Sequence, residues 1–230
     1  MKYMVIGLGI FGSSLAEKLT RMGGEVIGVD SRLDKVEAIK EKVTHAICLD
    51  STDPQAVATL PLKDMDVVIV AIGQNEGANL LTTALMKQQQ VKRLISRTVS
   101  PLHETILNAM GVEEIMRPEE ETASRWAKKL NIPGILESYE LAEENNIVEA
   151  VVPGRFAGRS LEELGFKSNY NVLVLTTIRQ VEARSLFGIM KKVSRVQEVA
   201  SAQTILKEGD ILVLYGKIGD IQRLIREGGD

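Results

Sequence analysis

Short apolar runs alternate with amphipathic segments between Lys2 and Leu130. A strand buried on both faces is apolar throughout, whereas a helix that packs on a sheet is apolar on one face only. The pattern therefore predicts an α/β fold, a Rossmann-like doubly wound parallel sheet with helices on both faces. The six predicted strands cover residues 2–7, 25–30, 45–49, 65–71, 92–96 and 113–116.

The last part of the chain has a different pattern. Residues 118–130 form a predicted helix, with glutamates in its first turn and lysines in its last, and the Pro-Gly pair at 133–134 ends it. Residues 138–146 are polar and acidic, which is typical of a connecting helix or linker. Predicted strands then follow at 148–152, 172–178 and 211–215, with short helices at 160–164 and 220–226.

These patterns predict two domains and a connection between them. We expect the Rossmann-like domain over residues 1–133, a linker or connecting helix over 134–146 and a small α+β domain over 147–230. A domain of about 80 residues buries little surface and often gains stability by dimerisation.

A glycine-rich sequence follows the first predicted strand and opens the first predicted helix. It consists of Gly7, Leu8, Gly9, Ile10, Phe11 and Gly12. This is the G-x-G-x-x-G pattern of dinucleotide-binding loops. Gly7 permits the tight turn, Gly9 lets a pyrophosphate approach the backbone, and Gly12 lets helix and strand pack closely. The N–H groups and dipole of the helix are expected to hold the phosphates.

Asp30 ends the second predicted strand, 18 residues after Gly12. An acid near this spacing accepts hydrogen bonds from the adenosine ribose and repels a 2′-phosphate. We therefore expect an adenine nucleotide, NAD(H), ATP, ADP or AMP, rather than NADP, a preference that nearby Arg32 weakens. The alternative is that Asp30 only caps the helix beginning near Leu33. Ser31 and Arg32 complete this part of the predicted site.

Further loops reach the same edge of the sheet, where open α/β sheets bind ligands. The predicted site includes Asp50, Ser51, Thr52, Ala71, Ile72, Gly73, Asn75 and Arg97 from the ends of the third, fourth and fifth strands. Polar residues after strands also cap helices, so pure capping is the alternative for the loops at 50–53 and 73–76.

Composition narrows the class of partner and the compartment. The net charge of -3 gives no electrostatic reason to expect nucleic acid. A single cysteine, Cys48, permits no internal disulfide, so a cytoplasmic location is expected, and its apolar surroundings predict a core residue. The longest apolar run, residues 67–72, is too short to cross a bilayer, so no direct membrane insertion is expected.

The chain resembles the regulatory subunits of bacterial Trk- and Ktr-type potassium uptake systems, which carry the RCK fold. The resemblance rests on the glycine loop, Asp30 and three shorter motifs in the first domain and its last helix, and on three motifs in the second domain. The further motifs are Asp50-Ser51-Thr52-Asp53, Ala78-Asn79-Leu80, Arg117-Pro118-Glu119, Ile147-Val148-Glu149, Gly158-Arg159-Ser160-Leu161 and residues 206–216.

The resemblance implies homodimers assembled into a tetrameric or octameric ring, docked on a membrane potassium-translocating subunit at the inner face of the cell membrane. Bound nucleotide would select the shape of the ring. By resemblance Glu119 lies near the phosphates or an accompanying cation, or is simply an acid in the first turn of a helix. Two positions depart from the family pattern: Ile10 replaces a frequent arginine, and Leu49 replaces a glycine.

Two other functions compete with this one. An NAD(H)-dependent oxidoreductase needs a proton donor or acceptor beside the nicotinamide, yet His45 and His103 lie on a predicted strand and a predicted surface helix, and no catalytic motif is found. A nucleotide-binding module that regulates another process is also consistent with the sequence. The helix around Trp126 either transmits movement to a neighbouring subunit or buries Trp126 in the core. A second effector, such as a cyclic dinucleotide, is a further possibility near residues 169–172.

Overall fold

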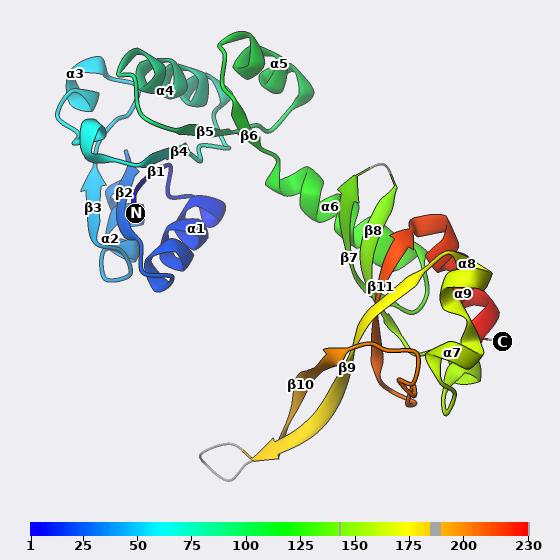
Figure 1. Ribbon diagram of the computed structural model, residues 1–230. Helices are drawn as coiled ribbons and strands as arrows, with labels where there is room; N and C mark the ends of the chain where they lie inside the picture. Colours follow the sequence, from blue (N-terminus) through cyan, green and yellow to red (C-terminus); the bar gives the residue numbers. More distant parts are fainter. Residues whose placement is uncertain (143, 185–189, 230) are drawn as a thin grey trace. The chain divides into compact units, whose positions relative to one another are not determined.

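The structure is a computed structural model that describes residues 1–142, 144–184 and 190–229 (Figure 1). The chain forms two compact units, with the boundary between Glu120 and Glu121. This boundary lies within helix α6 (Pro118–Asn131). Most of α6 therefore groups with the second unit, whereas the sequence pattern placed residues up to 133 in the first domain.

The first unit contains a six-stranded parallel sheet with the order β3-β2-β1-β4-β5-β6. Its strands are β1 (Lys2–Ile6), β2 (Glu25–Asp30), β3 (His45–Cys48), β4 (Val67–Val70), β5 (Leu94–Arg97) and β6 (Glu114–Met116). Strand order reverses between β1 and β4, which places a switch point beside the glycine loop. The predicted Rossmann-like sheet is confirmed.

Helices cover both faces of this sheet because successive side chains of a strand point to opposite faces. The helices are α1 (Ile10–Arg21), α2 (Leu33–Ile39), α3 (Pro54–Val57), η1 (Leu62–Asp64), α4 (Glu76–Gln88) and α5 (Pro101–Ala109). Val5 of β1 packs in a cluster with residues of α1 and α2. Met4 and Ile6 belong to a second cluster, with residues of α3 and α4. Figure 1 shows α1 and α4 on opposite sides of the sheet.

The second unit contains a five-stranded antiparallel sheet with the order β10-β9-β11-β8-β7. Its elements after α6 are β7 (Ile135–Ala142), β8 (Asn145–Val151), η2 (Gly154–Phe156), α7 (Leu161–Leu164), α8 (Phe166–Tyr170), β9 (Leu173–Arg184), β10 (Met190–Val199), β11 (Ile211–Lys217) and α9 (Ile218–Gly229). One apolar cluster joins this sheet to the short helices and α9. The predicted small α+β domain is confirmed.

The expected connecting helix or linker over residues 134–146 is wrong. Strand β7 occupies most of this stretch and pairs antiparallel with β8. The polar residues of β7 made this stretch look like a linker, because the sequence does not show that one of them is buried and paired with a polar side chain of β8. Ser138 is 6% exposed, and its Oγ lies 3.2 Å from Oδ1 of Asn146 on β8. Strand β10 and helix α8 were likewise not predicted.

Two side chains lie elsewhere than their sequence context predicts. Cys48, expected in the core, is exposed because β3 is an edge strand of the sheet. His103, expected on a surface helix, is only 1% exposed. Trp126 is 50% exposed, which removes the interpretation of a core tryptophan within this chain.

Across the described ranges, no helix combines the length and apolar character that spanning a bilayer requires.

Candidate functional site

A crevice of about 670 Å³ opens at the carboxyl ends of the parallel strands in the first unit. Its volume is within the range of small-molecule and cofactor sites. It is lined by Ile6, Gly7, Gly9, Ile10, Phe11, Ser14, Asp30, Ser31, Arg32, Lys35, Asp50, Ser51, Thr52, Ala71, Ile72, Gly73, Gln74, Asn75, Ala78, Arg97 and Glu119. All the predicted site residues except Leu8 and Gly12 are among them.

The glycine loop shapes one wall of the crevice. Gly7 adopts a φ of 96°, which favours glycine. A Cβ atom on Gly12 would lie 1.9 Å from the carbonyl oxygen of Gly7, so helix α1 can approach β1 only with glycine there. A Cβ on Gly9 would meet no atom within 4 Å, because Gly9 faces the open crevice.

Helix α1 begins at Ile10 with Gly9 as its N-cap, and Gly9 has no side chain to cap it. The first N–H groups of an α-helix have no carbonyl partner within the helix, and the helix dipole makes this end positive. The start of α1 is therefore a place where backbone donors and a partial positive charge meet the crevice. Ile10 is 96% exposed at this end.

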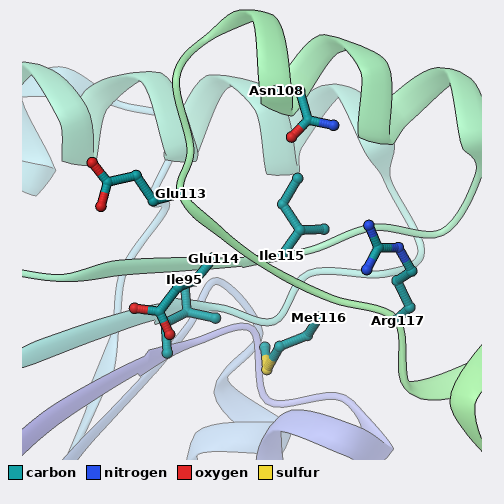
Figure 2. A pocket seen from close by; sticks show the side chains of 7 residues that line it. All are labelled: Ile95, Asn108, Glu113, Glu114, Ile115, Met116 and Arg117. Carbon is teal, nitrogen blue, oxygen red and sulfur yellow. The ribbon is translucent and has the colours of Figure 1, made fainter. Parts of the chain in front are cut away.

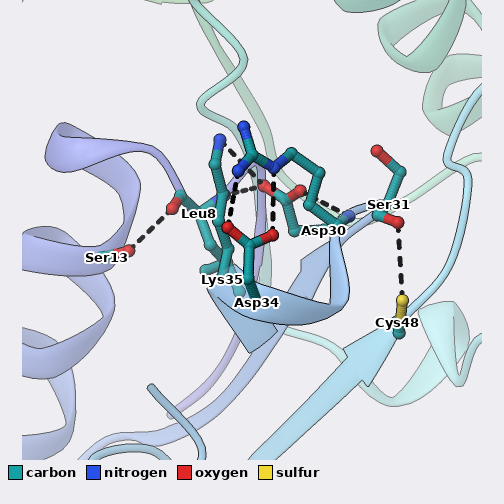
Figure 3. Close-up of polar contacts among 8 residues, drawn as sticks. Leu8, Ser13, Asp30, Ser31, Asp34, Lys35 and Cys48 are labelled. Atoms are coloured by element: carbon teal, nitrogen blue, oxygen red, sulfur yellow. Dashed lines mark hydrogen bonds and ion pairs between the residues drawn. The ribbon is translucent and has the colours of Figure 1, made fainter. Parts of the chain in front are cut away.

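Asp30 fixes the glycine loop to the end of β2 (Figure 3). Its side chain is 9% exposed, and Oδ2 accepts a hydrogen bond from the Leu8 backbone N–H at 2.7 Å. Oδ1 accepts from the Arg32 backbone N–H at 2.9 Å. A carboxylate offers about four acceptor positions, so these bonds leave capacity for ribose hydroxyls. Helix α2 has Arg32 as its N-cap, so Asp30 does not cap it.

Arg97 contributes a cation from the end of β5. Its side chain is 13% exposed and pairs with Glu119. The guanidinium carbon lies 5.4 Å from the centre of the Phe11 ring. A Cβ atom on Gly73 would come within 2.6 Å of that guanidinium carbon, so Gly73 makes room for Arg97. The buried Nε of Arg97 has no hydrogen-bond partner among the described residues.

A buried polar network around Asn79 supports the crevice from behind. Its Nδ2 donates to the carbonyl oxygens of Ile72 at 2.9 Å and Arg97 at 3.0 Å, and so joins the ends of β4 and β5. Its Oδ1 accepts from Ser96 Oγ at 3.1 Å and lies 3.2 Å from Nε2 of His103. Asn79 belongs to a motif of the family resemblance, but no rule of spacing predicts this role.

The loops after β3 and β4 combine capping with a place in the crevice. Asn75 accepts from the Ala78 N–H at 3.0 Å and caps α4, as the alternative interpretation expects, and it also lines the crevice. Asp53 caps α3 in the same way. Hydrogen bonds from the Thr52 side chain and backbone lower the pKa of Asp50.

Leu8 and Gly12 serve the fold rather than the crevice surface. Leu8 is 3% exposed and packs in the core beside Gly28. Lys35 and Ser14 line the crevice without having been predicted, because helix periodicity alone does not show which polar side chains face a ligand.

A second, smaller hollow of about 390 Å³ follows the edge strand β6 (Figure 2). Two of its three charged side chains already have partners. Glu114 pairs with Arg93, and Arg117 pairs with Glu104. We therefore assign no site to this hollow.

Comparison with known proteins agrees with the fold and the motifs. The family model described as the TrkA-N domain matches residues 3–118. Over 222 residues the chain is 32% identical to Ktr system potassium uptake protein C of Bacillus subtilis, covering 96% of this chain and 95% of that one. It is 30% identical to protein A of the same system and organism, covering 99% and 96%.

Solved structures share the architecture at low sequence identity. The GsuK channel superimposes with a TM-score of 0.65 at 17% identity over the whole of this chain. The present chain spans only 39% of the GsuK chain. A likeness at this identity shows the fold alone. The family match and the Bacillus relatives also show the family to which the chain belongs. The chain belongs to the TrkA-N family, together with the Ktr system potassium uptake proteins.

Proposed function

We propose that this chain is a nucleotide-sensing regulatory subunit of a potassium uptake system. The observation that carries the proposal is the crevice, in which the start of α1, Asp30 and Arg97 face one space. Backbone donors and a cation suit phosphates, and a carboxylate suits ribose hydroxyls. The names of the relatives over nearly the full chain support the potassium uptake role.

The ligand is an adenine nucleotide: NAD(H), ATP, ADP or AMP. Gly9 and the first N–H groups of α1 would hold phosphate, and Asp30 would hold the ribose. A structure of the GsuK channel bound to NAD has the same fold as this chain, with a TM-score of 0.63, which supports a dinucleotide as one member of this group.

Arg97 and Glu119 offer a way to convert binding into a signal. Glu119 lies in the first turn of α6 and pairs with Arg97 in the crevice. A phosphate that reaches Arg97 competes with Glu119 for the same cation. A ligand shifts a conformational equilibrium only through different affinities for the two states, and this exchange provides such a difference at the start of α6.

The regulated partner is a membrane potassium-translocating subunit, and the chain acts at the cytoplasmic face of the membrane as a homodimer within a ring. Apolar side chains exposed on the second unit support self-association, because a single chain leaves them in water. They include Trp126, Leu130, Leu173, Leu175, Val196 and Val199.

The oxidoreductase alternative receives no support from the crevice. Within the described part of the chain, its lining contains no histidine, cysteine or tyrosine. His103 points instead to Asn79 in the buried network.

Calorimetric titration with NADH, NAD, ATP, ADP and AMP tests the proposal. We expect tight binding by at least one of them, without hydride transfer to any substrate. The role of Asp30 is tested with Asp30→Asn rather than Asp30→Ala, because alanine would also remove the acceptor of the buried Leu8 N–H and so disturb the glycine loop. Asn keeps one acceptor, and we expect an affinity loss of about tenfold. Equal affinity in wild type and variant contradicts a role for Asp30 in binding.

A further inference from the structure

Opposite charges meet at the part of the crevice formed by the end of β2 and the start of α2, where Figure 3 labels Asp30, Asp34 and Lys35. The guanidinium of Arg32 pairs bidentately with Asp34, with Nε to Oδ1 at 3.0 Å and Nη2 to Oδ2 at 2.6 Å. Arg32 lines the crevice and is two residues from Asp30. The pair raises the pKa of Arg32 and lowers that of Asp34, through their hydrogen bonds.

The second cation of this region, Lys35, also has an acidic partner. Lys35 lines the crevice, and its Nζ lies 3.8 Å from Oδ2 of Asp30. Asp30 and Asp34 thus balance Arg32 and Lys35, two negative charges against two positive ones. A ribose hydroxyl can donate to Asp30, whereas a phosphate on the same ribose would meet a carboxylate and two cations already paired with acids.

We propose that Asp34 is a specificity-determining residue of the nucleotide site, which restricts it to adenosine with a free 2′-hydroxyl by occupying Arg32. This inference rests on the proposed function, because it concerns the ligand of the same crevice. An arginine next to the ribose is what allows Rossmann folds to accept a 2′-phosphate. Here Arg32 is present, but Asp34 holds its planar donor group in the geometry that a phosphate would use.

The expected effect is moderate because the pair is exposed. The side chains of Arg32 and Asp34 are 62% and 63% exposed, so solvent screens their attraction. Removing the Asp34 charge is expected to tighten binding of a 2′-phosphorylated ligand by about three- to tenfold. Affinity for the 2′-hydroxyl ligand should change by less than about twofold, because Asp30 is held by the backbone N–H groups of Leu8 and Arg32 and not by Asp34.

The probes are AMP and adenosine 2′,5′-bisphosphate, which differ only by the 2′-phosphate. Calorimetry gives the ratio of their dissociation constants for wild type, Asp34→Asn and the double variant Asp34→Asn with Arg32→Gln. We expect wild type to bind AMP more tightly than adenosine 2′,5′-bisphosphate. In Asp34→Asn the ratio of the two dissociation constants should fall by about three- to tenfold. In the double variant the ratio should return towards the wild-type value, because the arginine that would hold the 2′-phosphate is absent.

Glu37→Gln is the matched control. Glu37 lies on the same helix and pairs with Lys40, and it does not line the crevice. The same charge change there should leave the ratio within about twofold of wild type. An unchanged ratio in Asp34→Asn, an equal shift in Glu37→Gln, or a gain that survives loss of Arg32 each overturns the inference while the proposed function stands. Failure of wild type to bind either probe or any other adenine nucleotide instead contradicts the proposed function itself.

Discussion

The two units of the chain bury polar side chains for different purposes. In the first unit four buried polar residues, Asn79, Thr83, Ser96 and His103, form one hydrogen-bonded network behind the crevice. In the second unit the buried polar residues form small separate groups, such as the pair of Asp210 with Arg179 and the contact of Asn146 with Ser138. Parallel strands bring all their carboxyl ends to one edge, whereas antiparallel strands divide theirs between two edges. Among the described residues, this difference explains why a polar site connected across several strands forms at the parallel sheet.

The largest expected effects come from glycines at close backbone or ring approaches. Gly12→Ala would place Cβ 1.9 Å from the Gly7 carbonyl oxygen, and Gly228→Ala would place Cβ 2.5 Å from the Phe156 ring in the second unit. We expect each to destabilise its own unit by about 3 kcal/mol. Thermal unfolding and nucleotide calorimetry separate them, since only Gly12→Ala should abolish binding.

Gly9→Ala is the control for Gly12, because its Cβ has open space around it. The variant should fold like wild type and bind nucleotide more weakly, since the methyl group faces the crevice. If Gly228→Ala also abolished binding, the assignment of the site to the first unit alone would be contradicted.

Two buried asparagines allow the same substitution in each unit. Asn79→Leu leaves two carbonyls and the Ser96 hydroxyl without this partner, and Asn146→Leu removes contacts to Ser138, Lys128 and Glu144. Each should lower the free energy of unfolding by about 2 kcal/mol in denaturant titrations. Only Asn79→Leu should also weaken nucleotide binding, because Asn79 positions Ile72 and Arg97. Equal affinities in both variants would show that the network does not shape the site.

The smallest expected effect is the pH dependence of stability from His103. Burial lowers the pKa of His103, and its Nδ1 has no partner among the described residues. Below about pH 6.5 the unfolded chain therefore binds a proton that the folded chain does not, so the free energy of unfolding falls as the pH falls. The slope is at most about 1.4 kcal/mol per pH unit.

Denaturant titrations between pH 5 and 7.5 measure this slope. The window lies above the range in which acids with lowered pKa, such as Asp50 and Glu104, take up protons. His103→Gln should remove the slope, and the exposed His45→Gln should keep it. A slope that persists without His103 would contradict its assignment to the buried network.

The same contrast between the units explains what the sequence could predict. The central strands β1, β2 and β4 are largely buried, and all six strands of the first unit are short apolar runs between capped helices, so the pattern found all six. Strand β7 could not be recognised because its polar residues find partners on β8 and α6, as Lys128 does with Glu140. Such pairings depend on tertiary neighbours that no local period records.

The candidate site could likewise be predicted in part. The glycine loop, Asp30 and the loop residues followed from spacing and from the edge at which parallel strands end. Asn79 and Lys35 could not be predicted, because their roles depend on helices packing behind or beside the strand ends. Cys48 is exposed because β3 is an edge strand, a position that the Rossmann strand order itself implies; the expectation of a core cysteine rested only on the apolar residues around it.

A crystal structure of the full chain grown with ADP or NAD tests the central claim most directly. We predict density for the adenosine ribose within hydrogen-bond distance of Asp30 and for phosphate at the start of α1. A crevice that stays empty or is filled by protein side chains, with the nucleotide present in excess, would contradict the account.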